Sequence, residues 1–424
     1  MTFREFPLCR RQRPLAFLVT ALLAGSAWGG ADLPPANEVK AAIAAAPLVA
    51  AARAGLTAES ANRERLNAGP YEWTTRLSDQ QRRLRNAPNE GPRGPFNEWS
   101  VALERPVRLP AKAEADAALG EQGETTARIA VEDAQHETAR QLLAAWFQWL
   151  RARVAADQSQ AQAKLLSQLA GSTARRHTLG DAARLEAMQA DAAAAQADAQ
   201  WRQAQARLQA SSQELRVRFP AIAQPDDVRL PSPEPLVGSL ATWQDSIASK
   251  SHELALAGAE TRQARLAAQR AEAERTPDPV VGVHVGSDRG GEEKLVGVSL
   301  SIPFAGDARR AAARSQAARA NAVAYREEAL RQQVSADIAS RHATASAAQL
   351  AWERADQAAR QLEATADLSA RALALGEAGL AEVLLARRQA GEGRLAAELT
   401  RLDALEARYR LELDAHRLWD YDAD

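Results

Sequence analysis

Two short stretches of the chain alternate apolar and polar residues and end at or beside a proline. They cover residues 99–107 and 296–304, and their period of two residues is typical of half-buried β-strands. A second alternating stretch precedes each of them, at residues 70–77 and 279–286. We therefore expect two β-hairpins. Their connections are rich in glycine, proline, asparagine and charged residues and cover residues 78–97 and 287–294.

Long runs rich in alanine, arginine, glutamate and glutamine follow each predicted hairpin. Each run has the composition of a helix, extends for about 70 residues and ends at a Leu-Gly turn. The two turn glycines, Gly180 and Gly376, are 196 residues apart, and a second helical run follows each of them. This common period indicates two copies of one unit rather than chance likeness in alanine-rich sequence.

The helical runs carry apolar residues at the spacing of a coiled coil. Such a seam repeats every 3.5 residues and packs knobs into holes, and alanine between the large residues lets two backbones approach closely. A helix of about 60 residues would rise roughly 90 Å at 1.5 Å per residue, far more than a globular core requires. The clearest heptads are Trp201, Leu208 and Leu215 in the first copy and Leu395, Leu402 and Tyr409 in the second.

The first 31 residues have the pattern of a secretory signal peptide. Four arginines precede an apolar stretch of about 11 residues, which is shorter than the roughly 20 residues that span a bilayer. We expect export and cleavage after Ala31, with Ala27 as the alternative site. The single cysteine, Cys9, lies in this segment, so neither a disulfide nor a lipid-linked cysteine is expected afterwards.

We accordingly divide the chain into four parts. Residues 1–31 are the signal peptide, residues 32–219 the first copy, and residues 236–424 the second, with a proline-rich linker at residues 220–235. Helical segments are expected to open the two copies.

Composition and charge narrow the possible functions. After residue 31 the chain has 49 basic and 53 acidic residues, a net charge of −4, which gives no reason to expect a nucleic-acid partner. No later segment is long and apolar enough for a transmembrane helix, so insertion into a membrane would use the strands. Four strands are too few to close a barrel alone, and open edges are costly in lipid, so other chains would have to complete the sheet.

The duplicated order of strands, long helices and Leu-Gly turns, with a proline after the second strand, resembles the outer membrane factor (TolC-like) family. The similarity extends over the chain after residue 31 and is closest from Asp278 onward. The chain length and the opening residues 45–53 are most similar to the heavy-metal cation efflux (CzcC-like) branch. The resemblance implies a mainly α-helical fold with a small β part. It also implies a homotrimer, whose 12-stranded outer-membrane barrel continues into a periplasmic α-helical tunnel.

The resemblance implies a passive exit duct rather than an enzyme, with no cofactor. The protein would lie in outer-membrane lipid, with helices extending into the periplasm. A periplasmic adaptor (membrane fusion) protein would dock on it, and an inner-membrane pump of the resistance-nodulation-division type would supply the energy. Heavy-metal cations are the expected cargo. Drug efflux and type I secretion remain open for the same fold, and a soluble periplasmic coiled-coil scaffold is the alternative of another class.

The Leu-Gly turns are the expected contact sites for the adaptor, because in the family they lie at the tip of the tunnel. Glycine suits a sharp chain reversal, which often needs a positive φ. A helix C-cap without a partner is the alternative interpretation. The expected contact residues are Thr178, Leu179, Gly180, Asp181 and Ala182 in the first turn, and Leu375, Gly376, Glu377, Ala378 and Gly379 in the second.

The family also suggests residues for the tunnel entrance, where two acidic positions after the second turn favour cations. Glu382 occupies the first position, whereas Leu385 occupies the second, so one carboxylate ring is expected in place of two. Glu186 stands at the matching place in the first copy and is the candidate for a latch between neighbouring helices. A solvated glutamate on a helix face is the alternative for both residues.

Two further predictions concern aromatic residues and metals. Aromatic side chains near strand ends are expected at the membrane interface. No two histidines have metal-ligand spacing, and no HExxH motif occurs, so no metal site is expected. The interfacial aromatic residues are Tyr71, Trp73, Phe96, Trp99 and Phe304, and the six histidines are His136, His177, His252, His284, His342 and His416.

Overall fold

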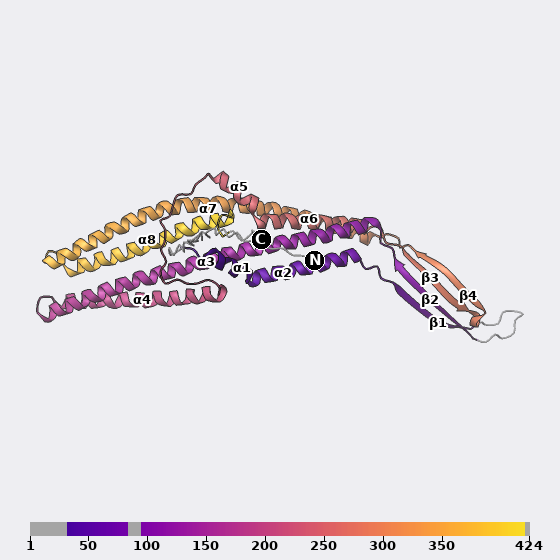
Figure 1. The fold of residues 1–424 in the computed structure, drawn as a ribbon, viewed down its shortest axis with the longest axis horizontal. Helices are drawn as coiled ribbons and strands as arrows, with labels where there is room; N and C mark the ends of the chain where they lie inside the picture. The colour runs from indigo at the N-terminus through magenta and orange to yellow at the C-terminus, as the bar shows by residue number, and fades with distance from the viewer. Residues whose placement is uncertain (1–31, 84–94, 420–424) are drawn as a thin grey trace, which may run out of the picture.

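The protein is elongated, with a four-stranded sheet at one end and helices along the rest (Figure 1). The computed structural model describes residues 32–83 and 95–419. The predicted signal peptide lies outside the described residues. In chain order the elements are α1 (Ala36–Ala44), α2 (Pro47–Ala68), β1 (Thr74–Arg82), β2 (Phe96–Pro106), α3 (Pro110–Thr178), α4 (Arg184–Arg218), α5 (Leu240–Lys250), α6 (His252–Ala273), β3 (Val280–Asp288), η1 (Arg289–Gly291), β4 (Glu293–Ser301), α7 (Asp307–Leu375) and α8 (Leu380–Asp414).

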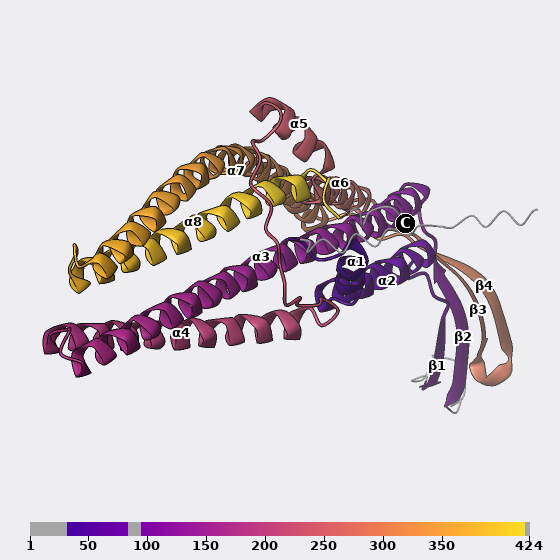
Figure 2. The same cartoon turned by 60° about the vertical axis from the view of Figure 1, so that its left-hand side comes forward.

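The sheet joins the two predicted hairpins side by side. Its order is β1-β2-β3-β4 and every pair is antiparallel, so β2 of the first hairpin pairs with β3 of the second. Val101, for example, lies opposite Leu77 on one side and Val285 on the other. The strands bend along their length (Figure 2). Within the described ranges, the outer edges of β1 and β4 have no further strand beside them.

The strands reach further toward the hairpin loops than the alternation predicts. β1 continues to Arg82, which pairs with Phe96, and β4 begins at Glu293. The predicted connections at residues 78–97 and 287–294 were therefore wrong at their boundaries. Polar side chains on both faces of these strand ends remove the period of two, so periodicity could not detect them.

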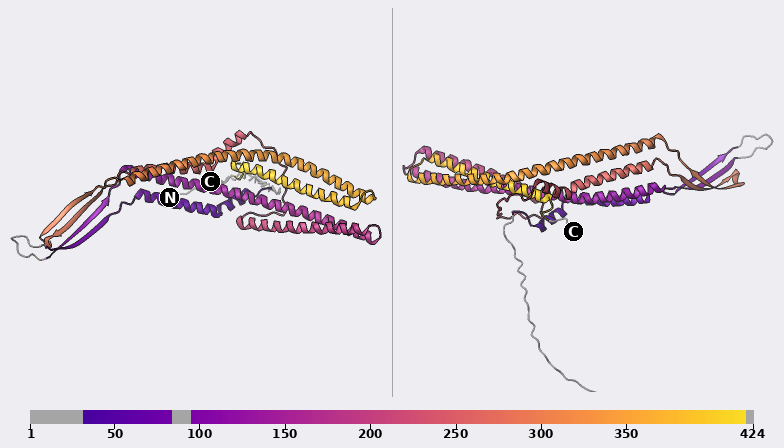
Figure 3. Two further views of the ribbon diagram at one scale, coloured as in Figure 1. Left: turned by 180° about the vertical axis from the view of Figure 1, so that it is seen from behind. Right: turned by 90° about the horizontal axis from the view of Figure 1, so that it is seen from above.

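The long helices confirm the prediction of two extended helical runs, each followed by a shorter one. α3 and α7 have 69 residues each, and α4 and α8 have 35 each. At 1.5 Å per residue, α3 is about 100 Å long. Both helical hairpins turn at the end farthest from the sheet (Figure 3). α3 begins with Pro110, where the missing N–H is no loss, and α7 ends at Gly376, which adopts a φ of 78°.

A core of large side chains surrounds the middle of α3. Trp146, Phe147 and Trp149 are almost completely buried there, against α1 and the ends of α4 and α8. The predicted coiled-coil seams contribute Leu215 from α4 and Leu402 from α8, both fully buried. The first half of the chain therefore supplies most of the bulky core.

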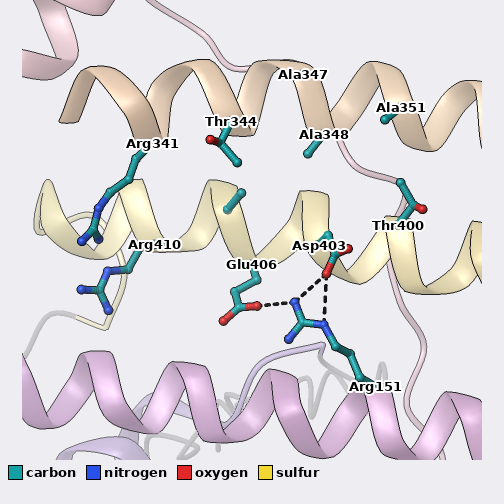
Figure 4. A pocket seen from close by; sticks show the side chains of 11 residues that line it. Arg151, Arg341, Thr344, Ala347, Ala348, Ala351, Thr400, Asp403, Glu406 and Arg410 are labelled. Atoms are coloured by element: carbon teal, nitrogen blue, oxygen red, sulfur yellow. Dashed lines mark hydrogen bonds and ion pairs between the residues drawn. The ribbon is translucent and has the colours of Figure 1, made fainter. Parts of the chain in front are cut away.

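α7 equals α3 in length but buries much smaller side chains. Counted from the first residue of each helix, Trp149 of α3 corresponds to Ser346 of α7. A groove of about 850 Å³ lies between α3, α7 and α8, and its α7 side is lined by three alanines, a threonine and Arg341 (Figure 4). Arg151 of α3 reaches across the groove, and its guanidinium donates to the carboxylates of Asp403 and Glu406 (Figure 4).

The length and apolar character of the helices bear on whether one of them could cross a membrane. In the described part of the chain, no single helix combines the length and apolar character that crossing a bilayer requires. The neighbouring α1 and α2 meet the criterion only as a pair bent by 52°. Val39 and Ile43 of α1 are buried in the core around α3, so this helix packs as a core element.

Candidate channel-forming and docking surfaces

One face of the sheet carries apolar side chains that the molecule leaves exposed. The strand register aligns Leu77, Val101, Val285 and Val296 in one row across all four strands. The Val296 side chain is 85% exposed. An exposed apolar face this continuous marks contact with lipid or with another molecule. The adjacent row on the same face consists of Thr75, Leu103, Val283 and Val298.

The opposite face of the sheet is polar and small. Arg76, Ala102, His284 and Gly297 form one of its rows. The His284 ring lies against Gly297, where an added Cβ would come within 2.5 Å of the ring. Because side chains alternate along each strand, this face is suited to water when the other faces lipid. The next row is Thr74, Glu104, Gly282 and Ser299.

The predicted interfacial aromatic residues lie toward the two ends of this sheet. Trp73 precedes β1 and Phe304 follows β4 at the helix end, and both are strongly exposed. Trp99 lies near the loop end, opposite Asp79, and is half exposed. Phe96 begins β2 and is partly buried beside the η1 turn. Exposed aromatic rings at both ends of an apolar strand face are typical of membrane interfaces.

The fifth aromatic residue belongs to a polar junction between sheet and helices. The Tyr71 hydroxyl donates to Oδ2 of Asp278, 3.0 Å away, just before β3. Burial, with the contribution of the Asp278 carboxylate, raises the pKa of Tyr71 to about 12. The Arg108 guanidinium lies over the Tyr71 ring, 5.6 Å from its centroid. Tyr71 thus ties the start of the first hairpin to the start of the second.

Lys112 of α3 lies at the centre of this junction and is completely buried. Its Nζ forms ion pairs with Glu274, at 3.2 Å, and with Asp278, at 3.0 Å. Burial alone would raise the pKa of Glu274, but its hydrogen bonds to Arg270, Arg309 and Lys112 outweigh burial and lower the pKa to about 2. A buried lysine is stable only when paired in this way, so the network fixes how the sheet meets the helices. Sequence reasoning missed this network, because its members come from four separate segments.

The first tip turn is held by side chains as well as by backbone. It connects α3 to α4, and Gly180 adopts a φ of 84°. Nη2 of Arg176 donates to the carbonyl oxygen of Asp181 at 3.2 Å, and Nδ1 of His177 donates to that of Ala182 at 2.9 Å. Leu179 at the apex is 78% exposed.

The second tip turn, between α7 and α8, has a similar backbone. Gly376 adopts a φ of 78°, and the N–H of Glu377 donates to the carbonyl oxygen of Ala372 at 2.8 Å. Leu375 is 74% exposed at the apex. No side chain closes this turn among the hydrogen bonds of the described residues, so its shape rests on the backbone alone. Both turns present an exposed leucine beside a left-handed glycine.

Glu186 and Glu382 occupy the same position in the first turn of α4 and α8, yet their contacts differ. The Glu186 carboxylate accepts a hydrogen bond from the N–H of Ala183, 3.2 Å away, and so caps α4. Glu382 is exposed, and α8 has no side-chain cap. Glu382 is therefore available to solvent at the tip, whereas Glu186 is engaged within its own helix.

Three of the six histidines meet in the fold although they are far apart in the sequence. His136, His252 and His416 lie together near the middle of the molecule, where α3, α6 and the segment after α8 converge. The spacing of these histidines in the sequence did not predict the cluster, because its members come from distant segments. Among the described residues, no group of three or more histidine, cysteine or acidic side chains is arranged to hold a metal ion.

Comparison with known proteins places the fold. No family model matches the chain, and no curated protein matches its sequence. Solved structures of outer-membrane channels do match. CusC gives a TM-score of 0.74 at 13% identity, covering 89% of this chain and 92% of CusC. VceC of Vibrio cholerae gives 0.70 at 16% identity, covering 92% of this chain and 99% of VceC.

A third match is MtrE of Neisseria gonorrhoeae, solved in its open state. Its TM-score is 0.69 at 17% identity, and the match covers 91% of this chain and 90% of MtrE. At these identities the likeness establishes the fold. The chain therefore has the fold of the outer-membrane channel proteins, which confirms the predicted combination of long helices with a small antiparallel sheet.

Proposed function

We propose that this protein is the outer-membrane channel of a tripartite efflux system, a passive exit duct for cargo delivered from an inner-membrane pump. The observation that carries the proposal is the open four-stranded sheet with one exposed apolar face and one polar face. In water such a face would favour aggregation, because exposed apolar surface and free strand edges pair with other chains. In a bilayer the same face is matched to its solvent.

Assembly of three copies completes the sheet. β4 of one protomer would pair with β1 of the next, giving twelve strands and removing every open edge. The apolar rows would then face lipid, and the row with Arg76 and His284 would face a water-filled lumen. The long helices, about 100 Å each, would continue the lumen into the periplasm. This arrangement needs no catalytic residues and no cofactor.

A matched pair of substitutions in β4 tests the two faces. Val298 and Ser299 are neighbours that point to opposite sides of the sheet. A lysine on the lipid face near the bilayer midplane costs about 2–4 kcal/mol, whereas the lumen tolerates it. Val298→Lys should therefore strongly reduce the amount of heat-sensitive trimer in outer membranes. Ser299→Lys should assemble normally and change the single-channel conductance.

Two outcomes would contradict the duct. Equal assembly of both variants would show that the two faces do not differ in their surroundings. Release of the wild-type protein by salt and alkaline washing of membranes would favour a soluble periplasmic scaffold instead.

We propose that the tip turns are the docking site for the periplasmic adaptor. The exposed leucines Leu179 and Leu375 support this, because isolated apolar side chains on a charged helix end suit a small apolar contact. The predicted contact residues from Thr178 to Ala182 and from Leu375 to Gly379 include both left-handed glycines. Crosslinking from a photoreactive residue placed at 375 should capture an adaptor, and placement at Leu350 on the exposed side of α7 serves as the control.

Heavy-metal cations are the cargo we propose, delivered by a pump of the resistance-nodulation-division type. The exposed carboxylate of Glu382 at the tip supports a cation-favouring entrance, since three copies would form a ring of negative charge. Glu382→Gln should weaken the block of single-channel current by multivalent cations. Unchanged block would remove Glu382 from the entrance. Deleting the gene should raise sensitivity to zinc, cobalt, cadmium or copper, and sensitivity to drugs alone would point to drug efflux.

A further inference from the structure

Three imidazole rings lie in contact where both halves of the chain meet. His136 of α3 and His416, just after α8, stack with centroids 5.1 Å apart and an angle of 16° between their planes. His252, at the start of α6, lies 4.9 Å from His416 and 5.9 Å from His136, measured between centroids. The cluster thus joins one residue from the first half to two from the second, across more than 250 residues of sequence.

A single buried carboxylate, Asp414 of α8, organises the positive charge around this cluster. It is 5% exposed and accepts hydrogen bonds from Nε of Arg140 at 2.8 Å and from Nη1 of Arg341 at 3.1 Å. Nε of Arg410 lies 3.5 Å away. The hydrogen bond from Nε2 of His136, at 3.3 Å, connects the carboxylate to the rings. Figure 4 shows Arg341 and Arg410 projecting from adjacent helices beside the groove.

His416 occupies a backbone conformation that favours glycine. Its φ is 54°, at the point where α8 ends and the N–H of Arg417 donates to the carbonyl oxygen of Glu412 at 2.8 Å. Glycine is the usual residue at this place in a helix C-cap, since other side chains cost roughly 1 kcal/mol there. The ring contacts of His416 offset that cost, so they contribute to holding the end of α8 in place.

The surroundings of His136 disfavour an additional positive charge on its ring, whereas Glu132 lies 3.5 Å from Nδ1 of His252. Burial lowers the pKa of His136, and the nearby Arg140 acts in the same direction against the hydrogen bond to Asp414. A cavity of about 40 Å³ beside His136 and His252 is large enough to admit a water molecule. The other charged groups near the rings are Glu132, Asp133 and Glu137 of α3, Lys250 of α5, Glu253 of α6, Asp337 of α7 and Arg417 after α8.

We propose that His136, His252 and His416 form an acid-sensitive latch that holds the end of α8 and residues 415–419 against α3 and α6. In the latched state the rings lie in contact, and the three guanidiniums share Asp414. Protonation of His136 adds imidazolium charge beside the guanidinium of Arg140, which weakens the ring contacts and releases the end of α8. The inference is independent of the proposed channel function, because it concerns a contact within one chain.

The direction of the pH effect follows from the lowered pKa of His136. A histidine that is protonated less readily in the folded state stabilises that state above its unfolded pKa, near 6.5. That contribution is lost as the pH falls below about 6.5. For one imidazole whose pKa is lowered in the closed state, the opening equilibrium rises as the pH falls from 7.5 to 5.5, by about tenfold at most.

Hydrogen exchange measured by mass spectrometry on the full chain tests the latch. At pH 7.5 and 5.5, with rates corrected for intrinsic exchange, peptides covering residues 411–419 should exchange faster at the lower pH, by up to about tenfold. Peptides covering residues 376–380 at the second tip, a turn closed by backbone hydrogen bonds, serve as the internal reference and should show no such change. Unchanged protection of residues 411–419 across this range would overturn the proposal.

Substitutions separate the latch from a merely structural role. His416→Gly removes the ring but suits the positive φ, so it should keep the C-cap at pH 7.5 and reduce the acid response. Combining it with His136→Gln and His252→Gln should abolish the acid response, whereas His177→Gln at the tip should retain it. A wild-type pH response in the combined variant would overturn the latch. If that variant does not fold, the acid response of His416→Gly decides, and a full response would count against the proposal.

Discussion

The helical hairpins α3–α4 and α7–α8 have the same lengths but are stabilised differently. α3 places Trp146, Phe147 and Trp149 in the core, whereas the corresponding residues of α7 are small or polar. Most buried residues of α7 are alanines, with Ile338 the largest of its buried apolar side chains. The comparison shows that two helices of the same length can have different roles, one packing a core of large side chains and the other burying mainly alanines. The first hairpin anchors the fold, and the second leaves much of α7 exposed along its length.

The same contrast appears at the junction with the sheet. Counted from the start of each helix, Lys112 of α3 corresponds to Arg309 of α7, and both contact the carboxylate of Glu274. Lys112 is completely buried, whereas the Arg309 side chain is 36% exposed. Two residues at matching positions therefore pair with the same carboxylate, one buried and one partly exposed. We expect the two ion pairs to contribute differently to the free energy of unfolding.

Truncating the core of α3 should have the largest effect. Trp149→Ala removes a fully buried aromatic side chain and should lower the free energy of unfolding by about 3–5 kcal/mol. The matched change in α7, Ser346→Ala, should stay within about 0.5 kcal/mol, because it removes no large contact. Chemical denaturation of the two detergent-solubilised variants compares them directly. Similar losses would mean that the two hairpins share the core equally.

Breaking the junction from either side should give the next largest difference. Lys112→Met leaves Glu274 and Asp278 without a buried cationic partner and should cost about 3 kcal/mol. Arg309→Met removes a partly exposed partner and should cost less than about 1 kcal/mol. Thermal unfolding followed by circular dichroism should rank the two variants in this order. The reverse order would show that solvent exposure does not determine how much each ion pair stabilises the fold.

The tip turns should show the smallest difference. Glu186→Ala removes the carboxylate that caps α4 and should cost about 1 kcal/mol locally. Glu382→Ala removes no cap and should leave α8 unchanged. Hydrogen exchange of the first turns of α4 and α8 measures both effects. Faster exchange in α8 but not in α4 would contradict the capping difference.

Patterns along the chain were sufficient for local structure. Alternation identified all four strands, and alanine-rich runs with Leu-Gly turns located the long helices and both reversals, because these features depend on neighbouring residues. The boundaries of β1 and β4 were missed where both strand faces are polar. The candidate tip residues could be named from a resemblance to a family. The difference between Glu186 and Glu382 depends on one hydrogen bond, which the spacing of residues in the sequence does not predict.

The sequence by itself determined the period of each element, the approximate length of the long helices and the order of strands and helices along the chain. Only the tertiary structure decided how burial and contacts differ between residues at matching positions of the two copies. It placed Trp149 in a core while the matching Ser346 stays partly exposed, and it buried Lys112 at the junction. It also brought His136, His252 and His416 into contact beside Asp414. The physical reason is that burial and charge pairing arise from segments far apart in the chain, whereas helix and strand periodicity arise from neighbours.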